Sequence, residues 1–203
     1  MAGSSTASAE GAEAGPCFYF DLASPEAYLV AERILALAPA PCAWVPVREA
    51  GLPGGFGAWR CAEERDIELA RLERTAADRG LQPVRWPTSL PFDSTLALRA
   101  ATYARGGGKT VPFALAAFRQ AYAGGRDLSR EEGVLLAGAA CEIHPRALLA
   151  GAGTARVAAE LDRATAQARE RGVRFTPAVW VAGEVFHGDD GLERAVATLR
   201  ALC

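Results

Sequence analysis

The chain has 203 residues, half of them hydrophobic, and a formal net charge of −2, which suits one domain or one domain with a sizeable insertion. The nearly balanced charge argues against nucleic-acid binding, because that function needs a clustered basic face. No apolar run approaches the roughly 18 residues of a membrane-spanning helix, so we expect no membrane segment.

Residues 1–15 are small and polar and precede the first apolar segment. They lack the basic start and the apolar centre of a secretory signal peptide. We therefore expect a disordered tail at this end and a cytoplasmic protein.

Residues 17–22, CFYFDL, predict a short buried strand. Ser24 suits the N-cap of a following helix and Pro25 its first position. Apolar residues then recur at helical spacing until Pro39. Residues 42–47, CAWVPV, predict a second strand. A strand, a helix and a strand in this order predict a parallel pair joined by a right-handed crossover.

The middle of the chain is predicted to be helical. The segment GLPGGFG, residues 51–57, has the turn chemistry of a linker. Six helical segments follow it, several of which end at glycine. Two of these segments are identified by their starts, near Ser129 and at Pro145. The other four are identified by apolar residues that share one face: Leu69, Leu72 and Ala76; Leu96, Ala100 and Tyr103; Leu115, Phe118 and Tyr122; and Val157, Leu161 and Ala168.

The end of the chain returns to strands. Residues 178–181 and 184–187 predict two strands joined by a tight turn. Asp189 or Asp190 suits the cap of a final helix. The order is therefore βαβ, a helical block and ββα, which predicts an α/β, thioredoxin-like fold with a large all-helical insertion.

We assign domain boundaries from these elements. Residues 16–50 and 155–203 form the thioredoxin-like domain, and residues 51–154 form the helical insertion domain. The reaction cleft is expected between the two. Three aromatic residues near the start of the insertion are candidate walls of this cleft: Phe56, Trp59 and Trp86.

The cysteines do not form a recognisable site. There are five of them, with no CxxC pair and no Cys/His cluster at zinc-binding spacing: Cys17, Cys42, Cys61, Cys141 and Cys203. This pattern gives no support to a dithiol redox motif or to a metal site. We expect buried or bystander cysteines and no metal.

Two short features can carry chemistry. Ser24 lies where a strand meets a helix, and a helix N-terminus stabilises an anion such as a thiolate; the alternative is that Ser24 only caps the helix. Thr176-Pro177 begins the strand at 178. A cis proline there would leave the preceding backbone free to pair with a bound extended chain, whereas the alternative is an ordinary trans proline.

Together these segments, "FYFDLASPEAYL … GVRFTPAVWVAGEVFHGDDGLERAV", resemble the DsbA-like thioredoxin superfamily. They are closest to the branch of 2-hydroxychromene-2-carboxylate isomerases and kappa-class glutathione transferases. The middle segment "PFDSTLALRAATYA" resembles the helical insertion of that branch. The resemblance covers about residues 17–203.

The resemblance implies roles for five residues. Ser24 would hydrogen-bond the sulfur of a bound thiol cofactor, glutathione or another low-molecular-weight thiol. Pro177 matches the cis proline, and the backbone of Thr176 would hold the peptide portion of the cofactor. Asp189 and Asp190 match the polar pair that binds the γ-glutamyl end.

The resemblance also implies an activity. The thiolate adds to a conjugated hydroxychromene, the ring opens, a bond rotates and the thiol leaves. The expected function is thus a thiol-dependent isomerase or transferase that acts on an aromatic or unsaturated small molecule. A homodimer is expected, because dimers are common in this branch.

The sequence departs from the family pattern near these positions. Glu26-Ala27 replaces an aromatic residue and a serine, Gly191 replaces an arginine, and His187 replaces an aromatic residue. Glu26, His187 and Trp59 are candidate substrate-pocket residues. His187 is either a general base or a filler of the aromatic's place.

Two other functions stay open. The first is a DsbA-family disulfide oxidoreductase homologue that lacks the CxxC pair, since Ser24 and Ala27 stand at the two motif positions. A dithiol needs two sulfurs within bridging distance, so we expect no dithiol oxidase activity. The second is a non-catalytic binding protein on the same scaffold.

Overall fold

The computed structural model describes residues 15–54 and 61–202, and in this part of the chain the sheet has four strands in the order β2-β1-β3-β4. They are β1 (Cys17–Phe20), β2 (Ala43–Pro46), β3 (Ala178–Val181) and β4 (Glu184–His187). The pair β1 and β2 is parallel, which confirms the prediction, and β3 runs antiparallel to both β1 and β4.

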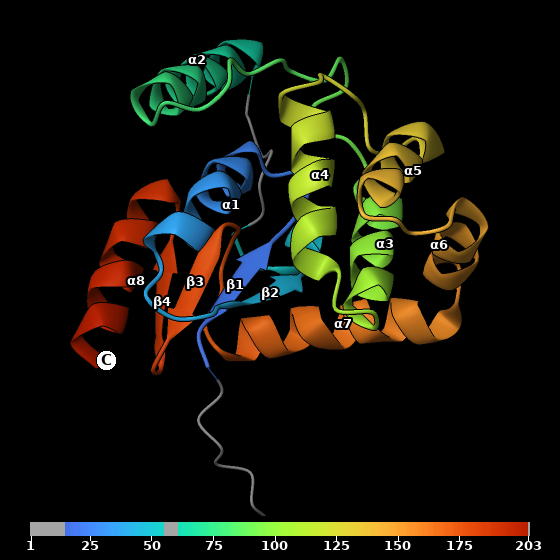
Figure 1. Cartoon of the computed structure of the whole chain (residues 1–203). Coiled ribbons are helices and arrows are strands. Elements are labelled where there is room, and N and C mark those ends of the chain that lie inside the picture. Colours follow the sequence, from blue (N-terminus) through green and yellow to red (C-terminus); the bar gives the residue numbers. More distant parts are fainter. Residues whose placement is uncertain (1–14, 55–60, 203) are drawn as a thin grey trace, which may run out of the picture.

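Helices cover both faces of the sheet (Figure 1). The side chains of β1 alternate between these faces, because successive residues of a strand point to opposite sides. Phe18 and Phe20 join the core that includes α1 (Pro25–Leu37) and α8 (Asp189–Leu202). Cys17 and Tyr19 join a second core beneath α7 (Ala155–Glu170).

The expected helices between the second and third strands are present. The elements before α7 are η1 (Glu49–Gly51), α2 (Ala62–Asp78), α3 (Thr95–Arg105), α4 (Thr110–Tyr122), α5 (Glu131–Ala140) and α6 (Pro145–Ala152). The strand–helix–strand start and the strand–strand–helix end enclose this helical segment. The predicted α/β fold with a helical insertion is therefore confirmed.

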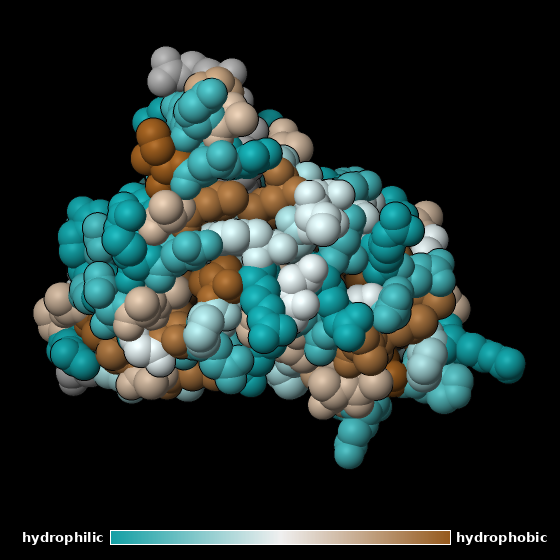
Figure 2. All heavy atoms as spheres, turned by 90° about the horizontal axis from the view of Figure 1, so that it is seen from above, coloured by the Kyte–Doolittle hydropathy of each residue, from teal (hydrophilic) through white to brown (hydrophobic). Residues whose placement is uncertain are grey.

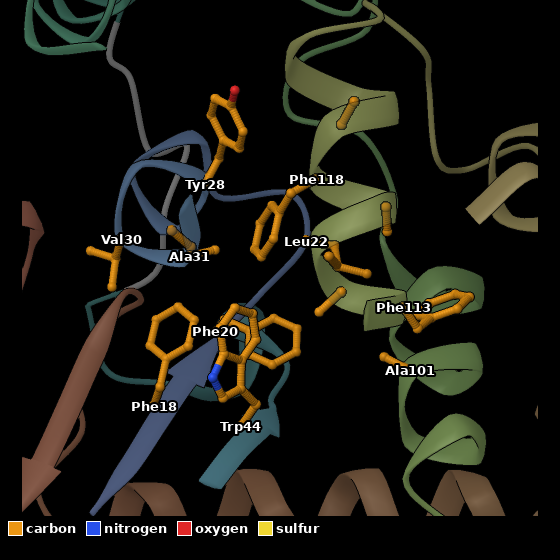
Figure 3. Close-up of a cluster of buried hydrophobic side chains, with 14 of the residues drawn as sticks. Phe18, Phe20, Leu22, Tyr28, Val30, Ala31, Trp44, Ala101, Phe113 and Phe118 are labelled. Carbon is orange, nitrogen blue, oxygen red and sulfur yellow. The ribbon is translucent and has the colours of Figure 1, made fainter. Parts of the chain in front are cut away.

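The insertion shares its core with the sheet. Phe118 of α4 packs against Phe20 of β1 with ring centroids 5.7 Å apart, and Tyr122 packs against Tyr28 of α1 at 5.6 Å. Figure 3 shows this aromatic cluster between the sheet, α1 and α4. Because the apolar surface is continuous, the insertion is fixed against the end of the sheet where β1 meets α1.

Within the described residues, no helix is both long enough and apolar enough to cross a membrane. The predicted tail, residues 1–15, lies outside the described residues except for Gly15.

Candidate functional site

Ser24 lies between β1 and α1 and is fully buried. Its Oγ accepts a hydrogen bond from the backbone N–H of Ala27 at 3.3 Å, so it is the N-cap that the sequence predicts. The same hydroxyl donates to the carbonyl oxygen of Thr176 at 3.2 Å. The cap and the predicted cofactor loop therefore meet at one oxygen atom.

The Thr176–Pro177 peptide bond is cis, as the resemblance implies. Both residues are buried. The hydroxyl of Thr176 donates to the carboxylate of Glu49, and the carbonyl oxygen of Pro177 accepts from the backbone N–H of Gly188 at 3.0 Å. This loop thus connects Ser24, Glu49 and the start of α8.

A cavity of about 250 Å³ opens beside Ser24. Its lining residues come from the end of the sheet and from the start of the helical insertion. Its described walls come from three segments: Asp21, Ala23 and Ser24; Arg48, Glu49 and Ala50; and Pro91–Thr95 with Leu98.

Two buried carboxyl groups face this cavity, and the sequence reasoning missed both. The carboxylate of Asp21 accepts the backbone N–H groups of Ala23 at 2.9 Å and Glu49 at 2.8 Å. Burial raises the pKa of Asp21 above its ordinary value, although these N–H donors oppose the rise. The side chain of Glu49 is held by Thr176. The cavity therefore has groups that can exchange protons.

A signal for these carboxyl groups is present in the sequence. Asp21 follows β1 directly, and Glu49 lies three residues after β2. Ligands of open α/β sheets bind outside the carboxyl ends of parallel strands. Acidic residues at the ends of two predicted parallel strands therefore point to this place.

Helices of the insertion and α7 hold the walls of the cavity in place. The guanidinium group of Arg48 donates to Asp162 of α7 at 3.1 Å and to Thr95 of α3 at 3.2 Å. The hydroxyl of Tyr122 of α4 donates to the carbonyl oxygen of Leu22 at 3.1 Å. The loop that carries Ser24 is thus tied to the helical segment.

The predicted γ-glutamyl partners, Asp189 and Asp190, lie at the start of α8. The carboxylate of Asp189 is buried and forms ion pairs with Arg33 of α1 and with Arg79 at the end of α2, the latter at 3.0 Å. The side chain of Asp190 is 97 % exposed and lies 3.5 Å from Arg79. Asp189 is therefore already neutralised by groups of the chain itself.

Glu26 lies in the first turn of α1 and is turned toward α8. Its Oε1 accepts the backbone N–H of Asp189 at 3.2 Å and lies 3.5 Å from the guanidinium of Arg71 in α2. Burial raises the pKa of Glu26. Glu26 is not among the described residues that line the Ser24 cavity.

His187 lies at the end of β4 and is likewise not among the described lining residues of that cavity. Its Nε2 accepts the backbone N–H of Arg174 at 3.0 Å, and its ring packs on Phe175 at 4.6 Å. Burial, with Arg174 and Arg194 nearby, lowers the pKa of His187. The lone pair that a general base would use is thus already hydrogen-bonded. This favours the alternative that His187 packs where the family has an aromatic residue.

Of the candidate aromatic walls, Trp86 is not among the described residues that line the cavity. Trp86 packs on Tyr122, with ring centroids 6.2 Å apart, and its indole N–H donates to Glu73 of α2. Phe56 and Trp59 lie outside the described residues.

Within residues 15–54 and 61–202, no group of three or more His, Cys, Asp or Glu side chains is arranged to hold a metal ion. The described cysteines are unpaired, and none of them lines the Ser24 cavity.

Comparison with solved structures shows the same fold. A 2-hydroxychromene-2-carboxylate isomerase has 21 % sequence identity and a TM-score of 0.84, over 94 % of this chain and 96 % of that chain. The oxidoreductase DsbA from Xylella fastidiosa has 14 % identity and a TM-score of 0.60, over 93 % and 84 %. The cytosolic disulfide reductase DsbM from Pseudomonas aeruginosa, solved with GSH, has 18 % identity and a TM-score of 0.62, over 93 % and 96 %.

No curated protein matches the chain. The sequence profile of the DSBA-like thioredoxin domain matches residues 17–200. This match covers the sheet, its flanking helices and the helical insertion together. The chain therefore belongs to the DSBA-like thioredoxin domain family.

Proposed function

We propose that the protein is a thiol-dependent isomerase or transferase of the 2-hydroxychromene-2-carboxylate isomerase type, which acts on an aromatic or unsaturated small molecule. The observation that carries this proposal is the buried hydroxyl of Ser24, which caps α1 and faces the loop of Thr176 and Pro177 beside a polar cavity. A hydroxyl cannot form a disulfide. In this proposal it donates a hydrogen bond to the sulfur of a bound thiol compound.

The local electrostatics suit a thiolate. The N-terminus of α1 carries a partial positive charge, which favours an anion placed there. The proton of Ser24 now points to the Thr176 carbonyl oxygen, and a bound sulfur would take that proton as a hydrogen bond instead. Such a bond to the charged form lowers the pKa of the thiol.

The proposed chemistry uses the thiolate as a nucleophile. Its sulfur forms a bond to the far carbon of the ring C=C bond, the electron pair of that bond moves to form a new C=C bond, and the ring C–O bond breaks with its pair on the released oxygen, which takes up a proton. After rotation about the resulting single bond, the enol loses its proton, the original C=C bond forms again and sulfur leaves as thiolate, so no net oxidation occurs. The proton transfers need an acid and a base near the cavity, and Asp21 and Glu49 are buried carboxyl groups in its described wall.

A disulfide oxidoreductase activity has less support. That reaction needs a pair of cysteines that cycles between dithiol and disulfide as the substrate is reduced or oxidised, whereas Ser24 and Ala27 stand at the motif positions. We expect no reduction of insulin disulfides unless a thiol is added. A positive result without added thiol would favour the oxidoreductase over the isomerase.

The test is calorimetric binding of a panel of small thiols, including glutathione and N-acetylcysteinylglycine, to the wild-type protein and to Ser24→Ala. We expect saturable binding of at least one thiol, and a loss of affinity of about tenfold in the variant, the size of a hydrogen bond to a charged group. A thiol that binds is then tested for turnover of a hydroxychromene carboxylate.

Thr154→Ala is the matched control, because Thr154 caps α7 through the N–H of Val157 at 3.3 Å and does not line the described cavity. Its loss should weaken a helix cap and leave thiol binding unchanged. Absence of binding by every thiol, or equal affinity in Ser24→Ala and the wild type, would overturn the proposal.

A further inference from the structure

The carboxylate of Glu26 lies where three helices meet. It comes from the first turn of α1, accepts the N–H of Asp189 in the first turn of α8, and pairs with Arg71 of α2. It also lies against Gly188, where a Cβ atom would come within 3.4 Å of Glu26 Oε1. The glutamate therefore fills the space in front of the α8 N-terminus.

A carboxylate is the group that this position favours, because the first N–H groups of a helix are unpaired and carry partial positive charge. Glu26 supplies that carboxylate from within the chain. A ligand carboxylate would have to displace it, and an intramolecular competitor acts at a high effective concentration. The position is thus closed to a weakly binding anionic ligand.

The neighbouring acidic group is closed in the same way. An ammonium group that approaches α8 would need the carboxylate of Asp189, whose side chain is only 3 % exposed. Arg33 and Arg79 already hold both of its oxygens. The zwitterionic end of an amino acid, with its ammonium and carboxylate, therefore finds both of its natural partners occupied.

This closed position adjoins the proposed sulfur site. Glu26 lies two residues after Ser24, and the backbone N–H of Gly188 donates a hydrogen bond to the carbonyl oxygen of Pro177 at 3.0 Å. A thiol compound held by Ser24 and the Thr176–Pro177 loop would extend toward the start of α8. Figure 1 shows α2 above α1 on this side of the molecule, and in Figure 2, seen from that side, hydrophilic side chains cover much of the surface.

We propose that Glu26 is a specificity-determining residue that excludes thiols with a free amino-acid end, so that the thiol used by this protein carries a neutral group in place of a γ-glutamyl group. This inference rests on the proposed function, because it names the class of thiol for that same site. Arg33 and Arg79 complete the exclusion by holding Asp189.

The test compares two thiols that differ only at that end. Glutathione carries a γ-glutamyl group on its cysteine, whereas N-acetylcysteinylglycine carries a neutral acetyl group on the same peptide. We expect the wild-type protein to bind glutathione no more tightly than the acetylated thiol. In Glu26→Ala, the affinity ratio should move toward glutathione by about fivefold or more, as a carboxylate site at a helix N-terminus becomes free.

Glu26→Gln keeps the shape of the side chain and removes its charge, so it should shift the ratio in the same direction by less. It also serves if Glu26→Ala fails to fold, which a thermal unfolding curve would reveal. Glu68→Ala is the matched control, because Glu68 pairs with the same Arg71 at 2.6 Å but lies on α2 itself. This variant should leave the ratio unchanged.

The outcomes separate the two proposals. If the wild-type protein binds glutathione at least about tenfold more tightly than the acetylated thiol, or if both Glu26 variants leave the ratio unchanged, Glu26 does not set the specificity. If no thiol of the panel binds the wild-type protein or any variant, the proposed thiol-dependent function falls, and the inference about Glu26 falls with it.

Discussion

The hydroxyl of Ser24 donates a hydrogen bond to the carbonyl oxygen of Thr176 at 3.2 Å, although 152 positions separate the two residues. Its lone pair accepts the N–H of Ala27, so one buried oxygen both caps a helix and ties the two ends of the fold together. In the proposed function, a thiol sulfur would replace the Thr176 carbonyl oxygen as the acceptor of this proton, and the bond from Ala27 would stay in place.

Ser24→Ala should lower the free energy of unfolding by about 1–3 kcal/mol, because it removes the cap and leaves the buried carbonyl oxygen of Thr176 without this donor. Urea unfolding measures the change. Thr154→Ala provides the reference, since it also removes a helix cap. The hydroxyl of Thr154, however, donates only to a carbonyl oxygen close in sequence, that of Gly151. A loss in Ser24→Ala no greater than in Thr154→Ala would show that the bond to Thr176 adds nothing.

Thr176→Val should also destabilise the protein, by about 1–3 kcal/mol, because it removes a hydroxyl donor from the buried carboxylate of Glu49 while keeping the shape of the side chain. Thr102→Val is a suitable comparison in the same unfolding experiment. Thr102 is equally buried, but its hydroxyl donates only to the carbonyl oxygen of Leu98, one turn earlier in the same helix. Similar losses in the two variants would contradict an added role for the Thr176–Glu49 bond.

Several parts of the fold were predictable because their signals are local. The cap at Ser24 depends on the residue type and the helix that follows it, and the parallel strands follow from the strand–helix–strand order. The helices of the insertion follow from apolar spacing and from the glycines between them. The cis bond before Pro177 came from the resemblance, because residue types near a proline do not determine its isomer.

The contacts that complete the site were not predictable in the same way. Glu49 meets Thr176 across 127 positions, and Arg33 meets Asp189 across 156. Charged residues on a predicted helix are ordinarily solvated, so nothing local distinguishes Arg33 or Arg79 from the many other arginines of the chain. Pairing at this range is decided by how the two ends of the chain pack together in the folded protein.

Asp21→Asn should change how stability depends on pH. Burial raises the folded-state pKa of Asp21, so the folded protein holds this proton more tightly than the unfolded chain does. The resulting stabilisation is present below the unfolded pKa of about 3.9 and is lost as the pH rises through the higher folded pKa. Asparagine does not titrate in this range and lacks this contribution.

The measurement is the difference in unfolding free energy between the wild type and Asp21→Asn, from about pH 4 to about pH 8. The stability of the wild type relative to the variant should decrease with rising pH. Titrations of the other carboxyl groups are shared by the two proteins and cancel in this difference. A difference that is constant over the range would show that Asp21 does not hold its proton more tightly in the folded state.

Arg79→Ala should loosen α2 while the rest of the protein stays folded. In α2 only Leu72 and Ala76 are buried, and the end of the helix is attached to α8 through ion pairs of Arg79 with Asp189 and Glu193. Hydrogen–deuterium exchange should therefore become faster in α2 and stay unchanged in α4, whose apolar face is buried in the core. Added salt should loosen α2 in the wild type in the same direction, since screening weakens partly exposed ion pairs.

Arg74→Ala is the matched control, because Arg74 lies on the same helix, is exposed, and has no ion pair among the described residues. It should leave the exchange of α2 unchanged. Faster exchange of α2 in both variants would mean that the loss of any arginine loosens this helix, and that the contact with α8 has no particular role. Unchanged exchange in Arg79→Ala would mean that the buried Leu72 and Ala76, with the ion pair of Arg71 and Glu26, hold the helix in place without Arg79.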